Sequence, residues 1–185
     1  MKPTDELIKE HHAILLSLEV LETMCGRIEA GEECNANDVA RLLDFLKTFA
    51  DGCHHQKEER HLFPAMEGAG VPRDRGPIGI MLSEHDLGRK HIRGMGESLA
   101  AWQAGRPEGA RELVRDARAY INLLRAHIMK ENTVLFPMAD RFLSPETQQT
   151  IAAAFAALEE EEIGENVHEQ YHELLHELHD TYLES

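Results

Sequence analysis

Residues 54–66 read HHQKEERHLFPAM and residues 127–139 read HIMKENTVLFPMA, so one pattern of His, Lys-Glu and Leu-Phe-Pro occurs twice in the chain. A second pair of segments, LIKEHHAI at 7–14 and MLSEHDLG at 81–88, repeats a Glu-His dipeptide. The number of residues that separates the first copy from the second is nearly the same for the two pairs of segments. Such an internal repeat predicts two similar halves, each with one helix that carries Glu-His and one that carries His-x-x-Lys-Glu.

The pattern along the rest of the chain favours helices. Apolar residues recur at spacings of three and four, and Gly and Pro cluster in a few places. We predict an all-α fold in which four helices form an antiparallel up-down four-helix bundle over residues 1–142. Residues 143–185 are predicted to form two additional C-terminal helices, an extension packed on or beside the bundle. The six predicted helices cover about 5–28, 38–66, 78–104, 107–140, 146–162 and 166–183.

Length and charge limit the classes of function. The chain has 185 residues, which corresponds to one domain of roughly 150 residues with some extra length. A formal net charge of −15 argues against nucleic acid or an anionic membrane surface as the main partner. The N-terminus has no apolar stretch of the signal-peptide kind, and three cysteines without paired spacing fit a reducing compartment. We therefore expect a cytoplasmic protein.

Histidine is unusually frequent, with twelve copies in the chain. On a helix, a His and a Glu four residues apart project from the same face. In antiparallel hairpins the Glu-His helix passes beside this face, so the repeated side chains converge in a core. Burying such groups without partners costs roughly 2–7 kcal/mol each, whereas a metal ion satisfies them together. The predicted metal ligands are His11, His54, Glu58, His85, His127 and Glu131.

This donor set indicates the kind of metal site. Imidazole and carboxylate without thiolate suit iron, manganese or zinc. If Glu58 and Glu131 both bridge, each of two ions receives two His and two carboxylate oxygens. One or two positions of a six-coordinate ion then stay open for oxygen, peroxide, nitric oxide or water. A structural zinc would close around one ion with four ligands, so six repeated ligands favour two ions.

At these residues the chain resembles the hemerythrin-like, or HHE cation-binding, family, whose members are four-helix bundles with a non-haem di-iron site. The resemblance covers about residues 5–140 and rests on EHHAI, HHQKEERHLFPAM, EHDLGR and HIMKENTVLFPMAD. It implies two iron ions, joined by an oxo or hydroxo bridge, on the six residues named above. His55 is a candidate for one extra ligand, because some family members place a ligand beside the first His of this helix.

Two departures from oxygen-carrying hemerythrins bear on function. Those proteins have a second His four residues after the one that matches His85, where this chain has Arg89. Their last carboxylate is an Asp five residues after its His, where this chain has Glu131 four residues after His127. These differences disfavour reversible oxygen carriage and favour the wider family, which is associated with iron or oxygen sensing, nitric oxide and peroxide handling, and repair of iron centres. The Cys-containing N-terminal domain of the repair proteins is not visible here.

Three functions therefore remain open. The first is a binding module that takes O2, nitric oxide or peroxide at an open iron position for sensing, buffering or iron handling. The second is a di-iron oxidoreductase that handles peroxide or nitric oxide, including iron-centre repair. The third is a structural zinc-binding bundle. Whether the protein is an enzyme, and its oligomeric state, are left open by the sequence.

Several other residues have two interpretations each. Glu10 and Glu84 precede the predicted ligands and are either supports for them or surface groups. Tyr120 is either a donor near the open position or ordinary core. The last predicted helix carries a histidine stripe that is either a second metal site or a solvated face; its members are His168, His172, His176 and His179.

Overall fold

The computed structural model describes residues 1–162 and 164–184, with the side chains of 162, 165, 166 and 168 outside the description. The predicted all-α class is confirmed, because the described residues form helices and connecting turns and contain no strand. None of the described helices is long and apolar enough to cross a membrane.

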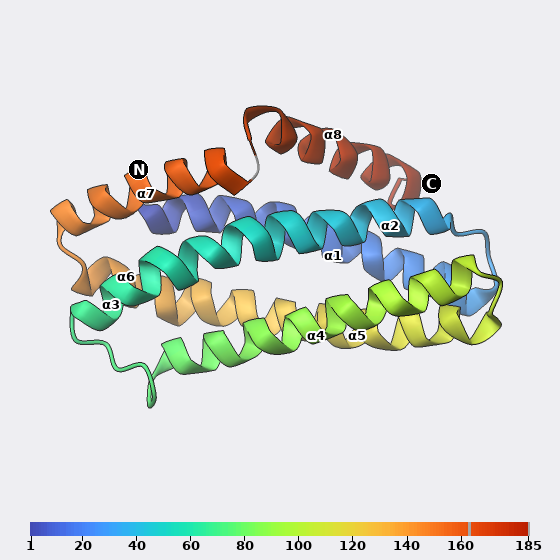
Figure 1. Ribbon diagram of the computed structural model, residues 1–185, viewed down its shortest axis with the longest axis horizontal. Coiled ribbons are helices and arrows are strands. Elements are labelled where there is room, and N and C mark those ends of the chain that lie inside the picture. Colours follow the sequence, from blue (N-terminus) through green and yellow to red (C-terminus); the bar gives the residue numbers. More distant parts are fainter. Residues whose placement is uncertain (163, 185) are drawn as a thin grey trace.

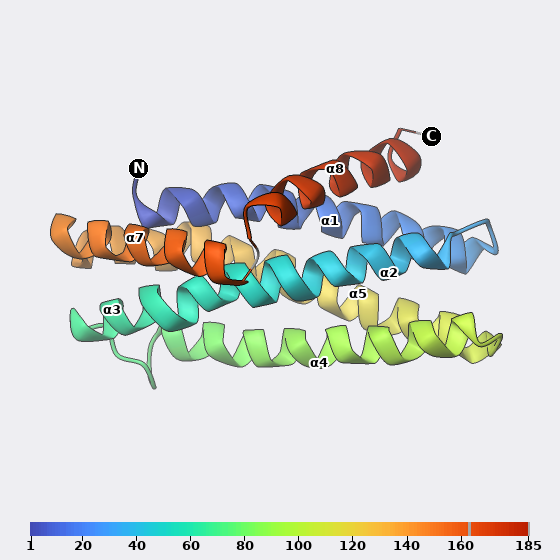
Figure 2. The ribbon, with the colours of Figure 1, turned by 45° about the horizontal axis from the view of Figure 1, so that its top comes forward.

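Four long helical segments lie side by side, and successive segments run in opposite directions (Figure 1, Figure 2). Two of the segments are single helices, α1 (Pro3–Ala30) and α4 (Pro77–Gln103). The other two are built from several pieces each. The second segment comprises α2 (Ala36–Phe45), η1 (Leu46–His55), η2 (Glu58–Leu62) and α3 (Phe63–Gly68), and the fourth comprises α5 (Pro107–Lys130), η3 (Glu131–Leu135) and α6 (Phe136–Phe142).

The segments made of several pieces contain π-helical turns that the sequence interpretation missed. Both Leu-Phe-Pro triplets lie inside a helical segment, at Pro64 and Pro137. Proline has no N–H to donate to the carbonyl four residues back, and its ring clashes with that carbonyl. The widened π turns η2 and η3 directly precede these two helices and accommodate the break. Each begins at the Glu of the repeated motif, Glu58 or Glu131.

The extension forms α7 (Pro145–Glu162) and α8 (Glu165–Tyr182). Figure 2 shows α7 and α8 along the side of the molecule formed by α1 and the second segment. The helix α7 contacts α1, η1 and η2, and α8 contacts α1 and α2. Phe155 of α7 and Leu178 of α8 are buried in these contacts.

The core is divided along its length into two apolar clusters. One cluster includes Ile14, Phe49 and Leu124, and the other includes Leu7 and Phe136. Along each of the four long segments, the predicted ligands fall between residues of one cluster and residues of the other. The polar residues therefore form one layer inside the molecule, closed from solvent by apolar side chains on both sides.

Candidate metal centre

All predicted ligand side chains meet in this polar layer. They come from all four long segments, so the layer requires the complete arrangement of helices. Each of them is almost fully buried, and the carboxylates of Glu58 and Glu131 have no exposed surface. The side chains that the structure brings together are His11, His54, His55, Glu58, His85, His127 and Glu131.

A first set of donor atoms centres on His11 and His54. Their Nε2 atoms lie 3.1 Å apart. The Oε2 atom of Glu131 lies 3.1 Å from Nε2 of His11. The Oε1 atom of Glu58 lies 3.7 Å from Nε2 of His54. These four side chains offer ligand atoms that are all close enough to hold one ion.

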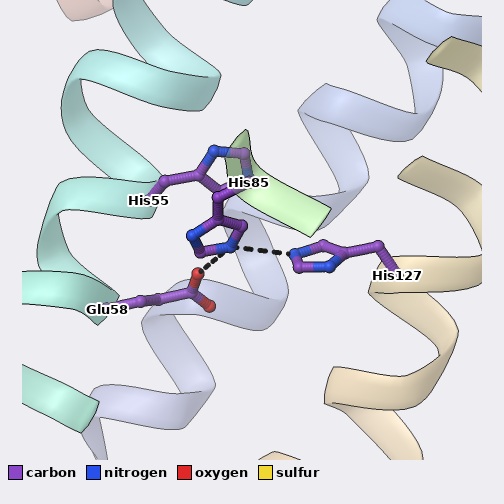
Figure 3. Close-up of side chains that lie close together, drawn as sticks. All are labelled: His55, Glu58, His85 and His127. Carbon is purple, nitrogen blue, oxygen red and sulfur yellow. Dashed lines mark hydrogen bonds and ion pairs between the residues drawn. The ribbon is translucent and has the colours of Figure 1, made fainter. Parts of the chain in front are cut away.

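A second set centres on His85 and His127, whose Nε2 atoms also lie 3.1 Å apart (Figure 3). The other oxygen of Glu58, Oε2, lies 3.3 Å from Nε2 of His85. The other oxygen of Glu131, Oε1, lies 3.0 Å from Nε2 of His127. Each of the two carboxylates therefore offers one oxygen to each set, as expected if both bridge.

The unsatisfied atoms of the layer fit a metal. All four carboxylate oxygens of Glu58 and Glu131 are buried without a well-formed hydrogen bond, and the polar atoms beside them are imidazole nitrogens of the layer itself. Buried carboxylates that are satisfied this poorly are costly, so a ligand that satisfies them is expected. Two ligand atoms that each lie ~2.1 Å from one ion, at right angles, are separated by about 3 Å. The shortest distances between ligand atoms in the layer, 3.0 and 3.1 Å, have this value.

His55 adds a third imidazole to the second set. Its ring stacks on that of His85, with 3.9 Å between centroids and 17° between planes. Its Nε2 is buried without a hydrogen-bond partner and lies close to the ligand atoms of Glu58, His85 and His127 (Figure 3). Burial, together with neighbouring His85, lowers the pKa of His55 to about 3, so the imidazole is neutral, the form that binds metals. In the other half, Ile128 stands at the equivalent position.

The two carboxylates differ in their protonation. Burial raises the pKa of Glu58 well above its usual value, and the nearby Glu131 carboxylate adds to the rise. Burial opposes the ionisation of Glu131 too, but His127 and His11 hold its pKa well below the usual value. A bound divalent cation would supply the positive charge that lets both carboxylates ionise.

Outer residues fix the orientation of the imidazoles. The Nδ1 atom of each principal histidine faces an oxygen, which leaves Nε2 directed into the layer. Glu10 accepts from His54 at 2.7 Å and Glu84 accepts from His127 at 2.8 Å, so both glutamates are supports rather than surface groups. The remaining pairs are His11 with Asn132 at 2.8 Å, His85 with Glu59 at 2.7 Å and His55 with Asp51 at 3.3 Å.

The sequence interpretation missed Asp51, Glu59 and Asn132. The repeat contained a signal for two of them, because Glu59 and Asn132 each directly follow the Glu of the motif. Asp51 has no polar equivalent in the other half, where Leu124 occupies the matching position. Its carboxylate is held by Arg89, whose Nε lies 2.9 Å from Oδ1.

Arg89 therefore has a role in the layer although it is not a ligand. Its Nη2 donates to Glu59 at 2.7 Å, and its Nε binds Asp51. These two carboxylates orient His85 and His55. Arg89 thus supports two of the three imidazoles in the second set.

The other candidate residues have different surroundings. The Tyr120 hydroxyl is buried and finds no hydrogen-bond partner among the described residues, and burial raises its pKa. In the C-terminal stripe, His172 and His176 are exposed. The side chain of His168 lies outside the described residues.

Comparison with known proteins points to the same region of the chain. The family model of the hemerythrin HHE cation-binding domain matches residues 2–139. Uncharacterized protein Rv1995 of Mycobacterium tuberculosis is 27% identical over 163 residues, which cover 87% of this chain and 62% of the relative. Iron-sulfur cluster repair protein YtfE of Edwardsiella ictaluri is 32% identical over 152 residues, 74% of this chain and 66% of the relative. The chain spans slightly less than two thirds of the length of these curated relatives.

Proposed function

Since the chain belongs to the hemerythrin HHE cation-binding family, we propose that its buried layer holds a non-haem di-iron centre. The centre binds a small ligand, O2, nitric oxide or peroxide, for sensing, buffering or iron handling in the cytoplasm. The observation that carries this proposal is the pair of donor sets that share the carboxylates of Glu58 and Glu131. The four long segments act as the up-down four-helix bundle of residues 1–142 that supplies these donors.

The two donor sets suit unequal coordination of two irons. His11 and His54 would hold the first iron, His55, His85 and His127 would hold the second, and the carboxylates of Glu58 and Glu131 would be shared by both. With an oxo or hydroxo bridge, the second iron would have six ligands and the first would have five. The bound centre would supply one open, redox-active position on the first iron, where a small ligand could bind.

The surrounding residues keep this position dry and its ligands fixed. The two apolar clusters close the layer from both sides, so a bound small ligand does not compete with bulk water. Glu10 and Asn132 orient the imidazoles of the first iron. Their hydrogen bonds at Nδ1 fix the tautomer and make Nε2 the ligand atom.

A second candidate function is turnover of peroxide or nitric oxide, including iron-centre repair. It is favoured by the similarity to relatives named iron-sulfur cluster repair protein. The two candidates share the site and differ in catalysis. Consumption of many equivalents of peroxide or nitric oxide per chain, in the presence of a reductant, supports the enzyme, and stoichiometric binding supports the binding module.

A structural zinc site is the least supported of the three functional hypotheses. Such a site closes with four ligands around one ion. Here five imidazoles and two shared carboxylates surround two positions, which a single closed ion leaves partly unsatisfied.

The stoichiometry of nitric oxide binding tests the proposal. The reduced, iron-loaded chain is expected to bind one nitric oxide per chain, because only the first iron has an open position. His55→Ala removes one ligand of the second iron and is expected to raise the stoichiometry to two, while both irons are retained. Titration with nitric oxide, followed by absorption and infrared spectroscopy, measures this.

The matched control is His12, which directly follows His11 in the chain and is exposed. Its replacement by Ala removes an imidazole that lies outside the layer. His12→Ala is expected to bind one nitric oxide. An iron-loaded parent that binds no small ligand contradicts the proposed function. A His55→Ala variant that still binds only one contradicts the assignment of His55.

A further inference from the structure

A cleft of about 590 Å³ opens between α2 with η1 on one side and α4 on the other. Its volume falls within the range of about 300–1,000 Å³ that is typical of small-molecule sites. No part of the proposed di-iron chemistry uses this cleft. The residues of its walls that matter here are Leu43, Lys47, Ile92, Arg93, Gly96 and Leu99.

Some charged side chains that line the cleft have partners, and others have none. Asp44 accepts a hydrogen bond from the Tyr171 hydroxyl at 3.1 Å, and Asp51 is held by Arg89. Lys47 and Arg93 are exposed, and neither side chain has a hydrogen bond or ion pair with any residue that the structure describes. In a chain with a net charge of −15, two cations without partners at one cleft make it a local site for an anion.

The cleft also offers apolar surface and free space. Leu43 and Leu99 are buried side chains that form its walls, and Ile92 is half-buried beside them. Gly96 lies on the cleft surface of α4, and a Cβ placed on it would have no heavy atom within 4 Å. A ligand with an apolar body therefore fits between the two helices while its charge meets Lys47 and Arg93.

The cleft is connected to the polar layer through two of its lining residues. Asp51 and Arg89 line the cleft and bind each other. On the inner side, Asp51 accepts from His55 and Arg89 donates to Glu59, the carboxylate that orients His85. A ligand in the cleft thus touches the residues that hold two imidazoles of the second set.

We propose that this cleft binds a small organic monoanion, a carboxylate with an aromatic or alkyl body, and that its occupation alters the metal centre through Asp51 and Arg89. Binding in the cleft does not depend on the proposed function, whereas the effect on the metal centre rests on that function.

Binding is tested with the fluorescent anion 1-anilinonaphthalene-8-sulfonate on the metal-free and the iron-loaded chain, with octanoate as competitor. One probe per chain is expected in both forms, displaced by octanoate. Lys47→Gln/Arg93→Gln is expected to weaken binding of the anion at least tenfold and to leave binding of the neutral analogue N-phenyl-1-naphthylamine within twofold. Gly96→Leu fills the cleft and is expected to weaken both probes at least tenfold.

Two control variants match these changes away from the cleft. Arg106→Gln/Arg111→Gln removes two exposed cations that do not line it, and Gly26→Leu fills open space at another helical glycine. Both are expected to bind the probes as the parent does. Unchanged binding in the Lys47/Arg93 and Gly96 variants would overturn the site, as would equal weakening in the controls.

The effect of a ligand in the cleft on the metal centre is measured separately from its binding. Saturating octanoate is expected to shift the absorption spectrum of the iron-loaded parent and to leave that of Gly96→Leu unchanged. Probe binding with no spectral shift overturns the coupling. A chain that binds no iron contradicts the proposed function, while the cleft is still tested on the metal-free protein.

Discussion

Glu58→Gln/Glu131→Gln is expected to lose both iron ions. Each carboxylate offers one oxygen to each donor set, so the double variant removes two ligands from each ion at once. Loss of an outer supporting residue alone typically costs about 10- to 100-fold in metal affinity, and loss of two direct ligands exceeds this. Iron content after gel filtration, measured by elemental analysis, gives the result.

The fold of this variant is expected to persist, because the neutral amides can donate to the imidazoles of the layer. Circular dichroism checks this point. The control is Glu97→Gln/Glu112→Gln, which makes the same chemical change at two exposed positions and should keep two irons. If the double variant at 58 and 131 keeps two irons, the bridging assignment is wrong.

Lys57→Met is expected to reduce the free energy of unfolding by about 3–5 kcal/mol, the usual cost of leaving a buried charge without its partner. The Lys57 side chain is 0% exposed, and its Nζ lies 2.7 Å from Glu6, 2.5 Å from Glu10 and 3.2 Å from Glu159. Glu10 orients His54, and Glu159 belongs to α7. One buried cation therefore joins the first donor set to the C-terminal extension.

The repeat supplies a matched control for this prediction. Lys130 occupies the equivalent position in the other half and pairs with Glu84, which orients His127. Its side chain is 36% exposed, so Lys130→Met is expected to cost only about 0–1 kcal/mol. Urea denaturation of the metal-free variants compares them without a contribution from bound metal. Equal losses at the two lysines would show that burial does not decide the effect.

Much of the candidate site is predictable from the sequence because the site is repeated. Two copies of a His and a Glu four residues apart, each beside a Glu-His helix, place six side chains in one layer by helical geometry alone. The structure brings these six together as expected. Their role as metal ligands is still a prediction.

The residues that break the repeat were harder to predict. His54 and His55 diverge by about 100° on a regular helix, so helical geometry alone does not bring both into one donor set. The layer contains two donor sets side by side, so each histidine reaches a different one. Asp51 and Arg89 accompany His55, and none of the three has an equivalent in the other half.

The function of Arg89 also depends on distant contacts. The sequence places it where oxygen-carrying hemerythrins have a second His, and nothing in the sequence tells which carboxylates it meets. In the structure it holds Asp51 and Glu59, which come from the second segment. The imidazole that stacks beside His85 comes from His55 instead.

The metal content of the chain, produced in iron-replete medium, tests the central claim most directly. Two irons per chain with an oxo-bridged absorption band are predicted, because two donor sets share two carboxylates in one buried layer. One tightly held, colourless and redox-silent zinc per chain would contradict it.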